Sequence, residues 1–247
     1  TSSRRARCAA SSRVRLMEVT GVLLGRMNFL APPTLVRTYH VLMTTNTVQF
    51  WFDVTCPFAW QTSRWIKEVE KVRDITVEWI PMSLSVLNDG RDLDPGYMCA
   101  MEAAWGPARV FTRVALEEPG AVDGLYTAMG TIIHAGKESG KKGFGAYDGV
   151  IEQALKDAGL SSIYATAANS EQVDEKLREF HDAAMESVGD DVGTPVLKLG
   201  DTAFFGPVIT RVPEGEEAGE LFDAAVRLAQ FPYFFELKRS RTENPQV

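Results

Sequence analysis

A cysteine followed by a proline marks the stretch of this chain whose residue types could do chemistry. An apolar strand pattern, Phe50 to Phe52, ends just before Cys56-Pro57. Pro57 suits the first turn of a helix, because its ring presets φ and its missing N–H would have no intrahelical partner. Cys56 is therefore predicted to lie at a helix N-terminus, where free N–H groups and the helix dipole favour a thiolate.

Cysteines in that position have pKa values of roughly 3.5–7.5 instead of about 8.5, which makes them nucleophilic at neutral pH. No acidic residue lies between Val54 and Phe58 to oppose this effect. The sequence thus predicts a reactive Cys56 with a lowered pKa. The alternative is that Cys56 is a small buried hydrophobe, as many lone cysteines are.

A second proline lies far downstream. Thr194-Pro195 precedes the apolar run Val196 to Leu199, which is typical of a loop entering a strand, and a proline is tolerated as the first residue of a strand. Cys-Pro-aromatic at a strand-to-helix junction, followed later by Thr-Pro before a strand, resembles the thioredoxin superfold. That resemblance implies a cis bond before Pro195 and contact with Cys56; an ordinary edge-strand proline is the alternative.

Several longer runs resemble one family within that superfold, the DsbA-related mycothiol-dependent nitroreductase/disulfide oxidoreductases, over about residues 47 to 247. The runs that carry this resemblance are Phe50-Trp51-Phe52-Asp53, Trp60-Gln61-Thr62-Ser63-Arg64-Trp65, Ala104-Trp105-Gly106-Pro107, Tyr126-Thr127-Ala128-Met129-Gly130, Asp191-Val192-Gly193-Thr194-Pro195, Phe204-Phe205-Gly206-Pro207 and Phe235-Glu236-Leu237-Lys238-Arg239.

The resemblance implies an α/β fold: a DsbA-like thioredoxin fold with an inserted all-helical subdomain at about residues 83 to 189. It implies Cys56 as the catalytic residue and mycothiol, or a similar thiol, as cosubstrate, with no tightly bound cofactor and no metal. The residues expected to bind the thiol or the substrate are Pro57, Phe58, Trp60, Trp105, His134, Thr194 and Pro195.

One position departs from the family pattern. Dithiol members carry Cys-Pro-Trp-Cys, whereas this chain has Ala59 at the last position and Phe58 as the aromatic. The expected activity is therefore thiol-disulfide exchange through a single cysteine, with a free thiol resolving the mixed disulfide. The alternatives are a thiol transferase or isomerase of the same fold, and a non-catalytic redox-sensing or binding protein.

Charge and cysteine content limit the partners. The chain has 247 residues and net charge −7; residues 1 to 46 carry seven arginines and one glutamate, so +6, which leaves −13 for the rest. An acidic body argues against nucleic acid or an anionic membrane as a partner. The three cysteines, Cys8, Cys56 and Cys99, form no disulfide framework, which favours a cytoplasmic protein. The partners that the resemblance implies are a small-molecule thiol and a disulfide or electrophile. A homodimer is left open.

The remaining expectations concern the N-terminal extension, one loop, the C-terminal tail and the secondary structure. Residues 1 to 46 are expected to be a disordered extension, with Met43 as the true start. A Gly-rich stretch at 136 to 145 does not have the glycine spacing of a phosphate loop and is expected to be a mobile lid. The aromatic stretch at 231 to 235 is expected to dock on the body.

Periodicity and turn signals predict the secondary structure. Helices are predicted at 57–73, 95–105, 107–118, 121–135, 147–158, 170–188 and 216–229, and strands at 48–52, 75–80, 196–199 and 202–205.

Overall fold

The computed structural model describes residues 46–247, so the predicted N-terminal extension and its start at Met43 lie outside the described residues, apart from Asn46. The main elements, in chain order, are β1 (Thr47–Phe52), α1 (Pro57–Val69), β2 (Thr76–Pro81), α2 (Leu84–Leu87), α3 (Pro95–Glu117), α4 (Val122–Gly130), α5 (Asp148–Asp157), α6 (Asp174–Val188), β3 (Val196–Leu199), β4 (Thr202–Phe205) and α7 (Gly215–Ala229).

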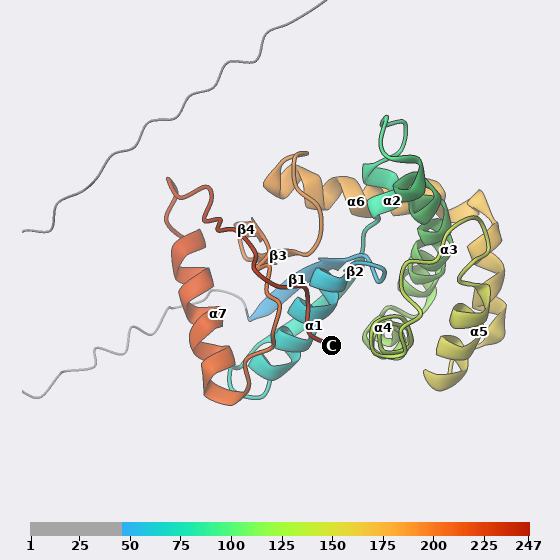
Figure 1. Cartoon of the computed structure of the whole chain (residues 1–247). Helices are drawn as coiled ribbons and strands as arrows, with labels where there is room; N and C mark the ends of the chain where they lie inside the picture. The colour runs from blue at the N-terminus through green and yellow to red at the C-terminus, as the bar shows by residue number, and fades with distance from the viewer. Residues whose placement is uncertain (1–45) are drawn as a thin grey trace, which may run out of the picture. The chain divides into compact units, whose positions relative to one another are not determined.

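The four strands form one sheet in the order β2-β1-β3-β4, with β1 and β2 parallel and β3 antiparallel to both of its neighbours (Figure 1). The β1-α1-β2 crossover brings the end of β1 and the start of α1 to one edge of the sheet. Cys56 follows β1 at that edge.

Pro81 lies inside β2 and pairs with Phe52, so the predicted end of this strand at residue 80 was wrong. Because β2 is an edge strand, Pro81 can take the last position on the side of the ladder that needs no N–H.

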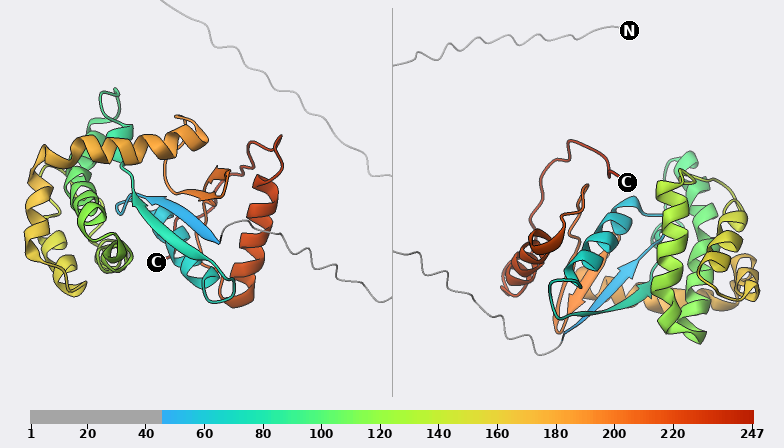
Figure 2. Two further views of the ribbon diagram at one scale, coloured as in Figure 1. Left: turned by 180° about the vertical axis from the view of Figure 1, so that it is seen from behind. Right: turned by 90° about the horizontal axis from the view of Figure 1, so that it is seen from below.

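Alternation along β1 sends side chains to both faces of the sheet. Phe50 and Phe52 enter the main core with α1 and α7, whereas Trp51 joins a smaller cluster with Met185 of α6. On the first face, Trp65 of α1 donates from Nε1 to the Ala218 carbonyl of α7 at 3.0 Å. Figure 2 shows α6 on the side of the sheet opposite α1 and α7.

The segment between β2 and β3 contains helices α2 to α6 and no strand within the described residues, which agrees with the expected helical insertion. It packs on the sheet through an aromatic cluster at the end of β1. Phe52 stacks on Tyr126 of α4 at a centroid distance of 4.0 Å and meets Phe111 of α3 edge-on at 5.1 Å.

Two helix predictions were wrong in detail. The pair predicted at 95–105 and 107–118 is one helix, α3, with Pro107 inside it. A proline removes one helical hydrogen bond, but buried residues on both sides, including Ala104 and Phe111, share one packing face that holds the helix together. The helix predicted at 121–135 changes at Thr131 into a π-helical turn, Thr131–Ala135, which contains His134.

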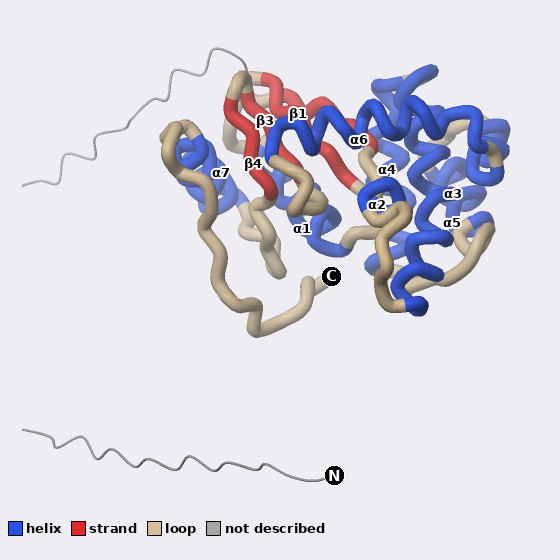
Figure 3. Tube along the Cα trace, turned by 90° about the horizontal axis from the view of Figure 1, so that it is seen from above, coloured by secondary structure: helices blue, strands red, loops and turns tan. Residues whose placement is uncertain are grey.

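The C-terminal tail does not dock through its aromatic residues. Tyr233 is 78% exposed and Phe235 is 89% exposed, so that prediction was wrong. The tail is held further along: Gln61 of α1 donates to the Gln246 carbonyl at 2.8 Å. Figure 3 shows the tail leaving α7 as an extended loop and returning to the neighbourhood of α1. No helix among residues 46–247 has the length and apolar character needed to span a membrane.

Candidate functional site

The loop between β1 and α1 presents Cys56. It turns through a hydrogen bond from the Cys56 N–H to the Asp53 carbonyl at 3.0 Å. Cys56 is the N-cap of α1 in extended conformation, and Pro57 is the first helical residue. The Cys56 side chain makes no regular capping hydrogen bond, but the first N–H groups of α1 lie near enough to its sulfur to act on the pKa of the thiol.

Asp53 ties this loop together and was missed by the sequence reasoning, which considered only Val54 to Phe58. Its Oδ1 accepts from the N–H and the hydroxyl of Thr55 at 2.8 and 2.7 Å, and its Oδ2 accepts from the Leu84 N–H at 2.8 Å. Burial raises the pKa of Asp53, and these hydrogen bonds oppose the rise. A polar residue directly after an apolar strand was the available signal. Asp53 thereby connects the loop that carries Cys56 to α2 of the helical insertion.

Thr194 and Pro195 reach the cysteine from the other end of the chain. The Cys56 thiol donates to the Thr194 carbonyl with a sulfur–oxygen distance of 3.6 Å, and the Thr194–Pro195 peptide bond is cis. The Thr194 hydroxyl donates to the Trp51 carbonyl at 3.1 Å, which fixes the residue against β1. The structure thus brings together three of the residues predicted for the site.

The prediction that Cys56 has a lowered pKa was wrong. Cys56 is only 7% exposed, and burial, followed among the raising effects by the charge of Asp53, raises the pKa of its thiol to about 11. The backbone N–H groups of Ala59 and Phe58 act in the opposite direction and lower the pKa. The helix N-terminus therefore faces the sulfur as predicted, but desolvation of the thiolate outweighs it.

Trp60 and His134 form a stack behind the Cys56 loop. Their ring centroids are 5.5 Å apart and nearly parallel, and the Arg64 guanidinium lies 4.2 Å from the centroid of Trp60. His134 Nε2 lies 2.8 Å from the Val54 carbonyl oxygen, and since a carbonyl only accepts, Nε2 carries the hydrogen. Burial lowers the pKa of His134. His134 thus holds the loop two residues before Cys56 as a neutral ring.

Phe58 is half-buried at the start of α1, while Pro57 before it is exposed. The guanidinium of Arg241, from the C-terminal tail, lies 4.5 Å from the centroid of the Phe58 ring. Arg241 is the second residue that sequence reasoning missed, and nothing in its local pattern pointed to the site.

Trp105 lies elsewhere. It borders a surface cavity of about 400 Å³ on the helical insertion, between the guanidinium groups of Arg109 and Arg178 at 5.2 and 5.5 Å from its ring centroid. No hydrogen bond or ring contact within residues 46–247 joins Trp105 to the Cys56 loop. The predicted role of Trp105 in thiol binding stays a prediction.

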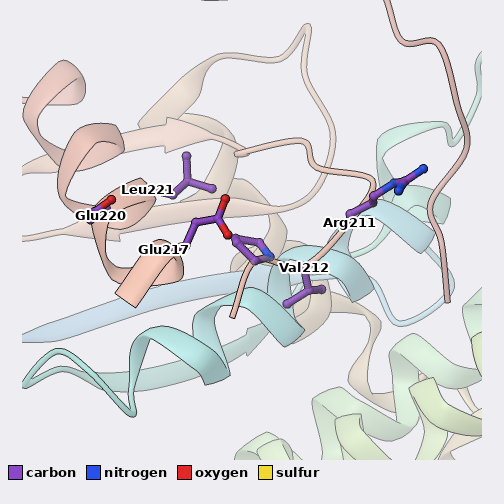
Figure 4. A pocket seen from close by; sticks show the side chains of 6 residues that line it. Arg211, Val212, Glu217, Glu220 and Leu221 are labelled. Carbon is purple, nitrogen blue, oxygen red and sulfur yellow. The ribbon is translucent and has the colours of Figure 1, made fainter. Parts of the chain in front are cut away.

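A second surface cavity, of about 560 Å³, is formed by α7 and the loop before it (Figure 4). Arg211 comes from the loop, and Glu217 and Glu220 come from α7. None of the residues predicted for the site lines this cavity.

Cys56 and Cys99 are both free, and Cys99 is exposed. The carbonyl of Cys99 accepts from the Gly143 N–H at 2.8 Å, which ties α3 to the Gly-rich loop. That this loop moves as a lid stays a prediction. No group of three or more metal-ligating side chains occurs among residues 46–247.

Comparison with known proteins defines the class. The chain has the fold of a crystal structure described as a probable DsbA oxidoreductase SCO1869 from Streptomyces coelicolor, at 16% identity and a TM-score of 0.50, covering 79% of this chain and 94% of that one. The protein is an oxidoreductase with a DsbA-like thioredoxin fold.

A family model places the chain in one family within this class. The family model for Rv2466c-like proteins, described as mycothiol-dependent nitroreductase Rv2466c, matches residues 55–239, and the chain belongs to this family. It is also 29% identical to the uncharacterized protein Rv2286c of Mycobacterium tuberculosis (strain ATCC 25618 / H37Rv) over 198 residues, which are 80% of this chain and 83% of that protein.

Proposed function

We propose that this oxidoreductase exchanges thiols and disulfides in the cytoplasm through Cys56 alone, with a low-molecular-weight thiol, mycothiol or a close analogue, as cosubstrate. The observation that carries the proposal is the placement of the Cys56 sulfur. It lies between the Thr194 carbonyl and the first N–H groups of α1, and Ala59 lies in that first turn, three residues after Cys56. The family description, which names mycothiol dependence, supports the choice of thiol.

The reaction has two exchange steps. The Cys56 thiol first loses its proton to a base in solution, and the thiolate attacks one sulfur of the substrate disulfide. A bond forms between Cys56 Sγ and that sulfur, and the other sulfur leaves as a thiolate with the bonding electron pair. A free thiolate then attacks the substrate sulfur of the mixed disulfide, so that Cys56 leaves as a thiolate and a new small disulfide forms.

The protein groups have separate roles in these steps. The Thr194 carbonyl accepts a hydrogen bond from the Cys56 thiol in the resting state, and the N–H groups of Phe58 and Ala59 stabilise the sulfur whenever it carries negative charge. Because Ala59 supplies no second sulfur, the oxidised enzyme is a mixed disulfide. The proposal therefore covers disulfide substrates and leaves nitro compounds aside.

The test is multiple turnover of a model mixed disulfide with excess mycothiol or an analogue. Cys56→Ser is expected to lower the rate by a factor on the order of 10³ or more, whereas Cys99→Ser retains it. If the wild type stops after one equivalent, the protein is a redox sensor and the proposal fails. If Cys56→Ser turns over like the wild type, the assigned nucleophile is wrong.

A further inference from the structure

The C-terminal tail brings a positive charge to the first turn of α1, next to Cys56. Arg241 stacks its guanidinium on the Phe58 ring, with 4.5 Å between the guanidinium carbon and the ring centroid. Phe58 is the second residue after Cys56, and its backbone N–H is one of the two that act on the Cys56 sulfur. Arg241 therefore lies beside the first turn of α1, whose N–H groups act on the Cys56 sulfur.

Hydrogen bonds of the residues that follow Arg241 hold the tail against the body and so fix the position of Arg241. Glu243 accepts from the Thr210 hydroxyl at 2.6 Å and from Arg211 at 2.7 Å. Gln246 donates from its N–H to the Thr210 carbonyl at 2.8 Å, while its carbonyl accepts from Gln61 of α1 at 2.8 Å. Arg241 thus lies in a segment held against α1 and the loop before α7.

Arg241 keeps an unneutralised charge. Among residues 46–247 Arg241 contacts the Phe58 ring and pairs with no carboxylate, whereas Arg73 and Arg211 each have carboxylate partners. A guanidinium stacked on an aromatic ring leaves its N–H edges free to bind a carboxylate or phosphate in two-pronged geometry. Arg241 is also exposed to solvent. These edges are therefore accessible to a ligand.

We propose that Arg241 is a specificity-determining residue that selects substrates carrying an anionic group, a carboxylate or a phosphate, close to the reacting sulfur. The inference rests on the proposed reaction at Cys56. Residue 241 lies beyond the residues matched by the family model, 55–239, so the family match does not account for this selection.

The experiment compares three disulfides in single-turnover reaction with Cys56, in a background with Cys8 and Cys99 changed to serine. The probes are dithiobis(nitrobenzoate), with two carboxylates, neutral dithiodipyridine, and cystamine, with two ammonium groups. The rate of each variant with the anionic probe is divided by its own rate with the neutral probe. This ratio corrects for any change in the accessibility of Cys56.

Arg241→Gln is expected to lower that ratio about 3- to 10-fold, and Arg241→Glu is expected to lower it further and raise the relative rate of cystamine. Arg241→Lys should keep most of the ratio, and added salt should weaken it in the wild type. Arg239→Gln is the matched control, since it removes the same charge from the same segment and should leave the ratio unchanged.

The proposal is overturned if Arg241→Gln and Arg239→Gln change the ratio equally, because the effect would then be one of net charge. It is also overturned if neither changes the ratio while all three probes react at Cys56. A different failure, no Cys56-dependent reaction with any probe in the wild type, would reject the proposed function itself.

Discussion

Gly130 lies so close to Trp60 that a Cβ built on the glycine would be 2.3 Å from Cζ3 of the indole. The indole cannot move away easily, because His134 stacks at 5.5 Å and Arg64 at 4.2 Å from it. Trp60 follows the Cys-Pro-Phe-Ala run directly. The contact between α4 and α1 behind the site therefore depends on the absence of a side chain at residue 130.

Gly130→Ala is expected to destabilise the fold by about 1–3 kcal/mol, the usual cost of overpacking a core. The matched control is Gly124→Ala in the same helix, where a Cβ would meet nothing within 4 Å. Alanine should there be neutral or stabilising by about 0.5–1 kcal/mol. Urea unfolding of both variants measures the difference, and equal stabilities would contradict the packing described for Trp60.

The raised pKa of Cys56 predicts that the rate of its alkylation keeps rising with pH well above neutrality. With a pKa of about 11, caused first by burial, the thiolate is a minor species at neutral pH. Iodoacetamide alkylation should therefore accelerate about tenfold per pH unit from pH 7 to pH 10. Mass spectrometry of the alkylated peptide separates Cys56 from Cys99. A plateau below pH 8.5 would show that the thiol is not desolvated as the structure indicates.

Asp53→Asn should lower the pKa of Cys56, because the carboxylate charge is one of the causes that raise it. The alkylation profile would then shift towards lower pH. Asp123→Asn, which removes a carboxylate that acts on Lys67 of α1 at 2.7 Å, serves as the control and should leave the profile in place. An unshifted profile in a folded Asp53→Asn variant would rule out the charge effect.

Because burial keeps His134 neutral, the free energy of unfolding is expected to fall as the pH falls below 6.5, the ordinary pKa of histidine. Burial lowers its pKa from 6.5, so the unfolded chain binds a proton that the folded protein does not. Stability is then fully present above pH 6.5 and is lost as the pH falls through 6.5 towards the lower folded pKa. His181, whose pKa is also lowered by burial, contributes in the same direction.

His134→Gln should remove part of this pH dependence and, at neutral pH, cost about 0.5–1.5 kcal/mol if the hydrogen bond to Val54 is lost. Unfolding by urea at several pH values between 5 and 7.5 gives the slope for each variant. His181→Gln is the comparison: it should reduce the slope without altering Cys56 alkylation. An unchanged slope in His134→Gln would mean that folding does not alter the pKa of His134.

Ala59→Cys is expected to create a dithiol couple. Residues 56 and 59 lie one helical turn apart, and the Ala59 N–H already acts on the Cys56 sulfur. After mild oxidation, mass spectrometry should detect the loss of two hydrogens, and Cys56 should resist alkylation until reduced. Ala59→Ser, of similar size, should form no such bond. If Ala59→Cys forms none either, the two sulfurs do not approach each other across the turn.

Sequence patterns predicted the framework well and the electrostatics of the site poorly. The alternation and turn signals placed Val196–Leu199 and Thr202–Phe205 at their observed bounds, since side-chain period and hairpin chemistry are local properties. Local reasoning also placed Cys56 at a helix start. It failed for the Cys56 pKa, because burial arises from segments brought together only in three dimensions. Arg241 was missed for the same reason: its partner, Phe58, is far away along the chain.

The hydrogen bond between Cys56 and Thr194 joins residues 138 positions apart. A ribosome therefore makes the reactive thiol early, but the carbonyl that covers it emerges only after the whole helical insertion. Throughout that interval the nascent chain carries a solvated thiol with an ordinary acidity, open to oxidants that the finished protein would resist. Protection of Cys56 against a short alkylation pulse consequently reports the time at which the segment around Thr194 packs against the β1–α1 loop during folding.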